Sequence, residues 1–83
     1  MEIREDIIST INNFLIDEFE LEEDQLQLDA QLKDDLDIES LDFVDIAVIV
    51  EKEFGFKVVN EEMISIRTLG DLYAYVQKKV DEK

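Results

Sequence analysis

The chain has 83 residues, of which 23 are acidic and 8 are basic, giving a formal net charge of −15. We expect a chain of this length to form one domain, residues 1–83, around a small core. The charge excludes binding to nucleic-acid phosphates and to anionic membranes, and it predicts partners with basic surfaces. The lack of cysteine and histidine excludes a disulfide framework, a thiolate nucleophile and the commonest general base and metal ligand.

Apolar residues at helical spacing open the chain. Ile3, Ile7, Ile11, Phe14 and Leu15 fall on one face of a helix, which predicts a first helix over about residues 2–18. A long connection then runs to residue 39. Loops of this length are unusual in a compact domain, so we expect the leucines of this one to be buried. They are Leu26, Leu28, Leu32 and Leu36.

The segment 40–54 is predicted to be a second helix, although its run of β-branched residues, 48–50, would also suit a buried strand. At about 100° per residue, two opposite faces emerge. The expected inner face carries Phe43, Ile46, Ala47, Val50 and Phe54, and the expected outer face carries Leu41, Asp45, Val48 and Lys52. Gly55 is expected to end the helix.

Two further helices are predicted near the C-terminus. Asn60 is expected to cap a short third helix, and Thr68 with Asp71 resembles a capping box at the start of the last one. Apolar residues keep the helical period afterwards, at Leu69, Leu72, Tyr73, Val76 and Val80. The predicted fold is all-α: a small antiparallel four-helix bundle with a long loop between helices one and two and a short third helix.

Neither a signal-peptide pattern nor an apolar run of the roughly 18 residues that cross a membrane is present. We therefore expect a soluble protein in the cytoplasm. Because like-charged surfaces repel each other, we also expect a monomer.

Ser40 lies where an acidic loop meets the apolar second helix. Serine is a common helix N-cap, and the unpaired backbone N–H groups at a helix start also suit a phosphate. Residues 34–45 carry six acids and no base, a field that would steer basic partners toward this serine. The residues alone therefore leave two interpretations open, a plain helix cap and a modified serine.

Other chemistries fit the sequence poorly. A calcium loop beginning at Asp35 would have Ser40 where the turn needs glycine and Ile46 where calcium needs a bidentate glutamate. Nothing indicates a cleft for paired carboxylates, and Ser40 has no histidine or nearby lysine to activate it. We therefore predict neither catalytic residues nor a specific metal site.

Three segments are together typical of one family. Leu32 to Asp42 reads Leu-Lys-Asp-Asp-Leu-Asp-Ile-Glu-Ser-Leu-Asp, Glu51 to Phe56 reads Glu-Lys-Glu-Phe-Gly-Phe, and Thr68 to Leu72 reads Thr-Leu-Gly-Asp-Leu. In these segments, and from about Leu32 through Val76, the chain resembles an acyl carrier protein. It departs from the family at Asp37, where glycine is usual, and at Glu39, which replaces aspartate.

The resemblance implies that Ser40 accepts a 4′-phosphopantetheine arm, taken from coenzyme A by a phosphopantetheinyl transferase. The thiol of the arm would carry acyl groups as thioesters to fatty-acid or polyketide-type enzymes, and the chain itself would be noncatalytic. Implied partner contacts are Glu39, Leu41, Asp42, Asp45, Val48, Glu51 and Glu61.

Implied acyl-pocket residues are Val44, Ala47, Val50, Ile66 and Leu72, which could equally be ordinary core. Two other functions stay open, a carrier of aminoacyl groups and a helical adaptor that is never modified.

Overall fold

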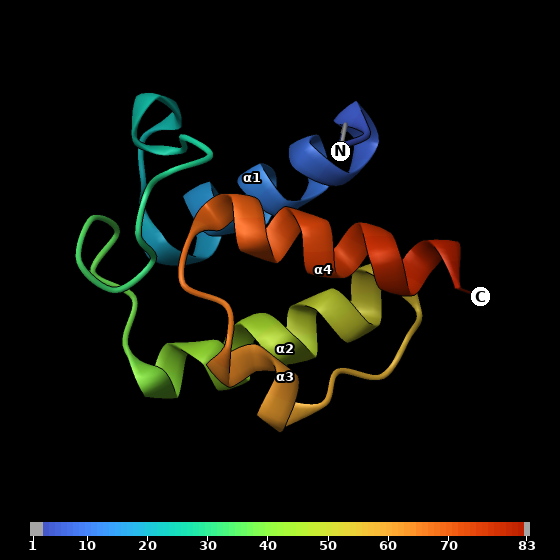
Figure 1. Cartoon of the computed structure of the whole chain (residues 1–83). Coiled ribbons are helices and arrows are strands. Elements are labelled where there is room, and N and C mark those ends of the chain that lie inside the picture. The colour runs from blue at the N-terminus through green and yellow to red at the C-terminus, as the bar shows by residue number, and fades with distance from the viewer. Residues whose placement is uncertain (1–2, 83) are drawn as a thin grey trace.

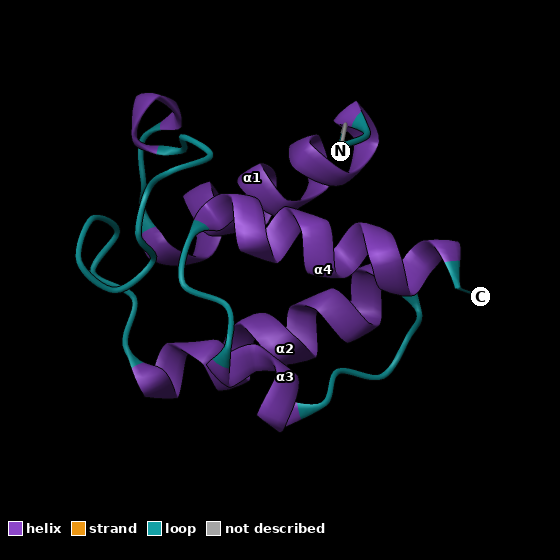
Figure 2. Ribbon diagram, viewed as in Figure 1, coloured by secondary structure: helices purple, strands orange, loops and turns teal. Residues whose placement is uncertain are grey.

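The computed structural model describes residues 3–82, and only the backbone at Ser40 and Asn60. The elements in chain order are α1 (Glu5–Phe19), a 3-10 turn η1 (Glu23–Gln25), α2 (Ser40–Phe54), α3 (Asn60–Ile64) and α4 (Leu69–Asp81). Figure 2 shows helices joined by loops, and the described residues contain no strand. The all-α prediction is therefore confirmed.

The three long helices pack as a small bundle, with α1 running opposite to α2 and α4 (Figure 1). The segment between α2 and α4, which includes the short α3, carries the chain back so that α4 runs in the same direction as α2. The residue before α1 contacts the last turns of α4. The backbone N–H of Arg4 donates to Gln77 at 2.7 Å, and the Arg4 guanidinium lies 3.3 Å from Asp81.

One hydrophobic core is built from the apolar faces that the periodicity predicts. It takes Ile7, Ile11, Phe14 and Leu15 from α1, Ile46, Ala47 and Val50 from α2, and Leu69, Leu72, Tyr73 and Val76 from α4. Phe43 and Phe54 pack against it and are partly buried. The hydroxyl of Tyr73 donates to the Asn12 side chain, and burial raises the pKa of Tyr73 to about 12.

The long loop, residues 20–39, is held against this core by some of its leucines. Leu32 and Leu36 are buried as predicted, and Leu26 is partly buried. The prediction is wrong for Leu28, whose side chain is 59% exposed. At that position the backbone makes the attachment, because the carbonyl of Leu28 accepts a hydrogen bond from Gly70 at 2.9 Å.

Backbone hydrogen bonds tie the loop to the start of α4. Besides Gly70, Leu69 donates its N–H to Ala30 O at 2.9 Å, and Leu32 donates to Arg67 O at 2.9 Å. The approach at Gly70 is close, since a Cβ added there would lie 2.8 Å from Leu28 O. Glycine is therefore required at this point by contact with the loop and not by its own backbone angle.

Two helix ends agree with the sequence prediction. Gly55 follows α2 with φ 74, in the left-handed region that glycine favours. Asp71 donates its N–H to Thr68 Oγ1 at 3.1 Å, and Thr68 returns its N–H to the Asp71 carboxylate at 3.2 Å. The predicted capping box at α4 is confirmed. At the other end of the chain, α1 begins at Glu5 rather than at residue 2, which lies outside the described residues.

Two predicted N-caps are wrong by one residue. Ser40 is the first residue of α2, and Glu39 precedes it with an extended backbone and donates its N–H to the Asp42 carboxylate at 3.0 Å. Asn60 is likewise the first residue of α3, after Val59. The Glu39 carbonyl accepts the first backbone hydrogen bonds of α2, and the Val59 carbonyl accepts those of α3. These hydrogen bonds, and not the residue type, determine where each helix begins.

Candidate functional site

The segment leading to Ser40 is fixed by alternate burial. Leu36 and Ile38 point into the core, and Ile38 donates its N–H to Leu32 O at 2.8 Å, whereas Asp37 and Glu39 are exposed. Asp37 has φ 56, a left-handed conformation that L-residues other than glycine rarely adopt. The start of α2 is thus held at the surface by the buried residues on either side of this turn.

The exposed face of α2 carries an apolar stripe. Leu41 is 80% exposed, and Val48, predicted with it for the outer face, is 59% exposed. Val44, implied for the interior, is 57% exposed and lies on this stripe instead. The reason is geometric, because Val44 lies two positions before the buried Ile46, a rotation of about 200° around the helix. The structure therefore does not bring Val44 together with the other implied pocket residues.

The acids implied as partner contacts fall into two groups. Glu39, Asp45 and Glu61 have exposed side chains. Asp42 and Glu51 are half-buried and make structural bonds: Asp42 accepts from the backbone of Glu39, and Glu51 accepts from Val58 N–H at 3.0 Å. Contact of any of these residues with a partner remains a prediction, and Glu39 also belongs to the capping box at the start of α2.

The remaining implied pocket residues are interior. Ala47, Val50, Ile66 and Leu72 are all buried and belong to the same core cluster. This burial suits an acyl pocket and ordinary core packing equally, so their role stays a prediction.

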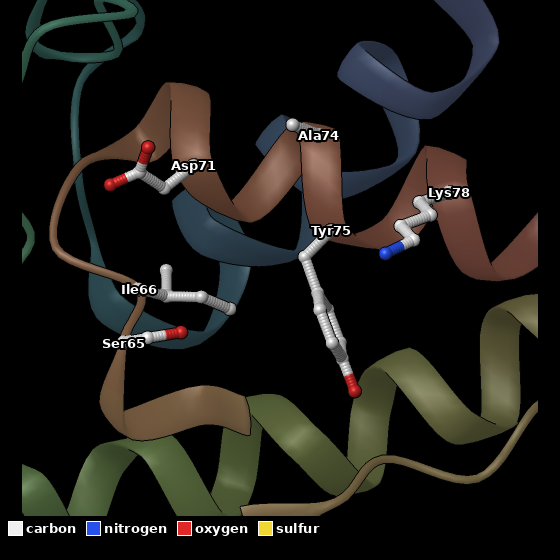
Figure 3. A pocket seen from close by; sticks show the side chains of 6 residues that line it. All are labelled: Ser65, Ile66, Asp71, Ala74, Tyr75 and Lys78. Atoms are coloured by element: carbon white, nitrogen blue, oxygen red, sulfur yellow. The ribbon is translucent and has the colours of Figure 1, made fainter. Parts of the chain in front are cut away.

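Two recesses lie near the segment between α3 and α4, and Ile66 borders both. One, of about 310 Å³, is lined by Ser65, Ile66, Asp71, Ala74, Tyr75 and Lys78, with the Tyr75 ring extending from α4 toward α2 (Figure 3). The other, of about 440 Å³, is lined by Gln31, Lys33, Asp34, Phe43, Ile64, Ile66 and Arg67.

The sequence prediction missed the contacts that hold α3 against α4. The Tyr75 hydroxyl donates to Glu62 Oε1 at 2.9 Å, and Lys79 Nζ lies 3.2 Å from the same oxygen. The hydrogen bond from Tyr75, followed by that from Lys79, lowers the pKa of Glu62, and Glu62 in turn raises the pKa of Lys79. The spacing of Tyr75 and Lys79 indicates one shared helix face, but nothing in the sequence points to Glu62 as their partner.

Metal and membrane features can be stated for the part of the chain that the structure describes. Within residues 3–82, no three acidic side chains gather closely enough to hold a metal ion. Over the same residues, no helix combines the length and the apolar character that crossing a membrane demands.

A small helical domain with a serine at an acidic helix start is typical of a carrier protein, and comparison with known proteins supports this class. The family model described as "Phosphopantetheine attachment site" matches residues 9–76. The chain is 38% identical over 80 residues to the acyl carrier protein of Thermotoga maritima, covering 96% of this chain and 99% of that protein. It is 39% identical over 75 residues to the acyl carrier protein of Rhodococcus erythropolis, covering 90% and 82%.

The meromycolate extension acyl carrier protein of Mycobacterium bovis is 37% identical over 79 residues, covering 95% of this chain and 69% of that protein. The chain belongs to the acyl carrier protein family. It is a carrier with a covalently attached 4′-phosphopantetheine group that works in fatty-acid or polyketide-type synthesis, as the sequence resemblance implies. The residues present fit this group, because the start of α2 offers a serine and, beside it, the N-terminus of a 15-residue helix.

Proposed function

We propose that Ser40 is the residue that bears the arm. The observation that carries the proposal is the position of Ser40 as the first residue of α2, between the exposed Glu39 and Leu41. Backbone N–H groups and the helix dipole at this start favour a phosphate. When attached, the arm supplies a terminal thiol that carries acyl chains as thioesters.

The transfer itself belongs to a phosphopantetheinyl transferase. The serine oxygen forms a bond to the phosphorus that bears pantetheine in coenzyme A, and the P–O bond of the pyrophosphate breaks. Adenosine 3′,5′-bisphosphate leaves, and the serine proton passes to the transferase. The carboxylate of the neighbouring Asp42 is already engaged, because it accepts a hydrogen bond from the backbone N–H of Glu39. The base for this step is therefore assigned to the transferase.

We further propose that the chain is a noncatalytic, monomeric carrier, with residues 1–83 acting as one domain in the cytoplasm beside its enzymes. Their basic surfaces would meet the exposed apolar stripe of α2 and its acids, among them Asp45. Cell fractionation and light scattering test the location and the monomeric state.

Intact-mass measurement tests the attachment. The apo protein is incubated with coenzyme A and a broad-specificity transferase, together with Ser40→Ala and the matched variant Ser65→Ala. Ser65 is exposed and lies just after α3. The wild type and Ser65→Ala should gain the mass of one arm, and Ser40→Ala should gain none. An equal gain in Ser40→Ala, or none in the wild type, contradicts the proposal.

A charge reversal tests the docking face. Asp45→Lys is a cleaner change than Asp42→Lys, because Asp45 is exposed and Asp42 also caps α2. With Asp29→Lys as an equally charged control in the long loop, only Asp45→Lys should slow the transferase and weaken the salt dependence of its rate. Equal rates for the two variants would mean that this face is not where the transferase docks.

A further inference from the structure

The residue three positions before Ser40 holds an unfavourable backbone conformation. Among the described residues other than glycine, only Glu20 and Asp37 have a positive φ, and Glu20 has it because it ends α1. Asp37, with φ 56, follows no helix. Glycine would adopt this conformation without steric cost, and strained residues of this kind gather at functional sites. The Asp37 side chain is therefore a candidate for a functional role that offsets the strain.

Buried neighbours fix the backbone on both sides of Asp37. Leu36 is buried and donates its N–H to Gln31 O at 3.1 Å. Ile38 is buried and donates its N–H to Leu32 O at 2.8 Å. Between these two core residues, Asp37 is exposed. Its carboxylate is therefore presented to solvent from a backbone that cannot turn it inward without moving Leu36 and Ile38 out of the core.

The other carboxylates close to Ser40 are already engaged. Glu39 and Asp42 bond to each other's backbone N–H groups in the capping box at the start of α2. Asp35 accepts a backbone N–H within the loop at 2.8 Å. Over residues 3–82, the Asp37 carboxylate has no hydrogen bond or ion pair. It is therefore the acid closest in sequence to Ser40 that is free to bind a cation from outside the described chain.

One docked enzyme can cover both Asp37 and Ser40. Three residues of fully extended chain span at most about 11 Å. A protein interface of ordinary size covers about 800 Å² of each partner, which is much wider than this span. An enzyme that binds the serine therefore also meets the Asp37 carboxylate, and the net charge of −15 favours enzymes that meet it with a basic surface.

We propose that Asp37 is a recognition residue in the transfer of the arm, and that its carboxylate binds a guanidinium or ammonium group of the transferase docked on Ser40. This inference rests on the proposed function. A short side chain on a fixed backbone suits a charge-assisted hydrogen bond, since little conformational freedom is lost when the cation binds. Because glycine is usual in the family at this position, the contact would distinguish this chain from other carriers.

Steady-state kinetics of arm transfer to the whole apo protein tests the contact, with coenzyme A and the broad-specificity transferase. Asp37→Asn removes the charge and keeps a residue type that tolerates a positive φ, so the melting temperature should not change. The variant should raise KM by up to about fivefold, as expected of an exposed ion pair, with kcat little changed. The difference from the wild type should disappear at high salt.

Two further variants separate the carboxylate from the strain and from the overall charge. Asp37→Gly removes the charge and also relieves the positive φ, and it should raise KM as much as Asp37→Asn does. Asp29→Asn removes one charge at an exposed position elsewhere in the loop and should leave KM unchanged. A wild-type KM in Asp37→Asn, or an equal rise in Asp29→Asn, overturns the inference. Failure of the wild type to gain the arm, seen by mass, contradicts the proposed function instead.

Discussion

Replacing Gly70 by alanine sets helix propensity against a close contact. Gly70 is the second residue of α4, and in a helix interior alanine is favoured over glycine by about 1 kcal/mol. A Cβ at this position would, however, lie 2.8 Å from Leu28 O, whereas ordinary contact begins at 3.4 Å. The loop would have to retreat by the difference, 3.4 − 2.8 = 0.6 Å.

That retreat disrupts two hydrogen bonds. The N–O distance from residue 70 to Leu28, now 2.9 Å, would reach the outer limit of a hydrogen bond, and the adjacent bond from Leu69 to Ala30 would be strained. At about 1 kcal/mol each, their loss exceeds the gain in propensity by about 1 kcal/mol. For a domain of this size, the melting temperature should fall by about 4–8 °C.

Thermal unfolding followed by circular dichroism measures whether Gly70→Ala raises or lowers the melting temperature. Amide hydrogen exchange shows which hydrogen bonds are weakened. The amides of Leu69 and Leu32, which donate to Ala30 and Arg67, should exchange faster in Gly70→Ala. Ala74→Gly, in the same helix, calibrates the propensity difference alone. A higher melting temperature in Gly70→Ala with unchanged exchange would show that the loop does not constrain this position.

Three further outcomes are expected. Because the hydrogen bonds from Tyr75 and Lys79 lower the pKa of Glu62 below its usual 4.5, they stabilise the fold above that pH and lose effect as pH falls through the lower, folded-state value. Glu62→Gln should therefore melt slightly lower than the wild type at pH 7, and the difference between the two melting temperatures should shrink as the pH falls below 4.5. Glycine adopts the positive φ of residue 37 without steric cost, so Asp37→Gly should raise the free energy of unfolding by about 0.5 kcal/mol. The control Asp29→Gly makes the same charge change at a residue without a positive φ and should give no such increase. Leu32→Ala should destabilise by about 3 kcal/mol in denaturant unfolding, since Leu32 is fully buried, and a loss under about 1 kcal/mol would contradict the attachment of the loop to the core.

Periodicity was sufficient to predict the faces of α2. The β-branched run from Val48 to Val50 raised the alternative of a strand, yet Ile46 and Val50 are buried and Val48 is exposed, as a helix requires. The end of α2 at Gly55 and the capping box at Thr68 could also be predicted from the sequence, because each depends on residues within a few positions of one another.

Features that depend on distant residues could not be predicted. Leu28 is attached to Gly70 through its backbone carbonyl while its side chain is exposed, and α3 is anchored by the hydrogen bond between Glu62 and Tyr75 of α4. Val44 shows a different limit, since its implied place came from a family resemblance while the helical phase set by Ile46 turns it outward.

The bonds between the long loop and the start of α4 also impose an order on folding. They join residues near 30 to residues near 69, and closing a loop of about 40 residues costs about 3 kcal/mol of chain entropy. Their partners are Arg67, Leu69 and Gly70, so a growing chain that has not yet released these residues from the ribosome cannot form these bonds. Under the proposed function, a chain truncated before α4 should therefore gain the arm at Ser40 more slowly than the whole chain.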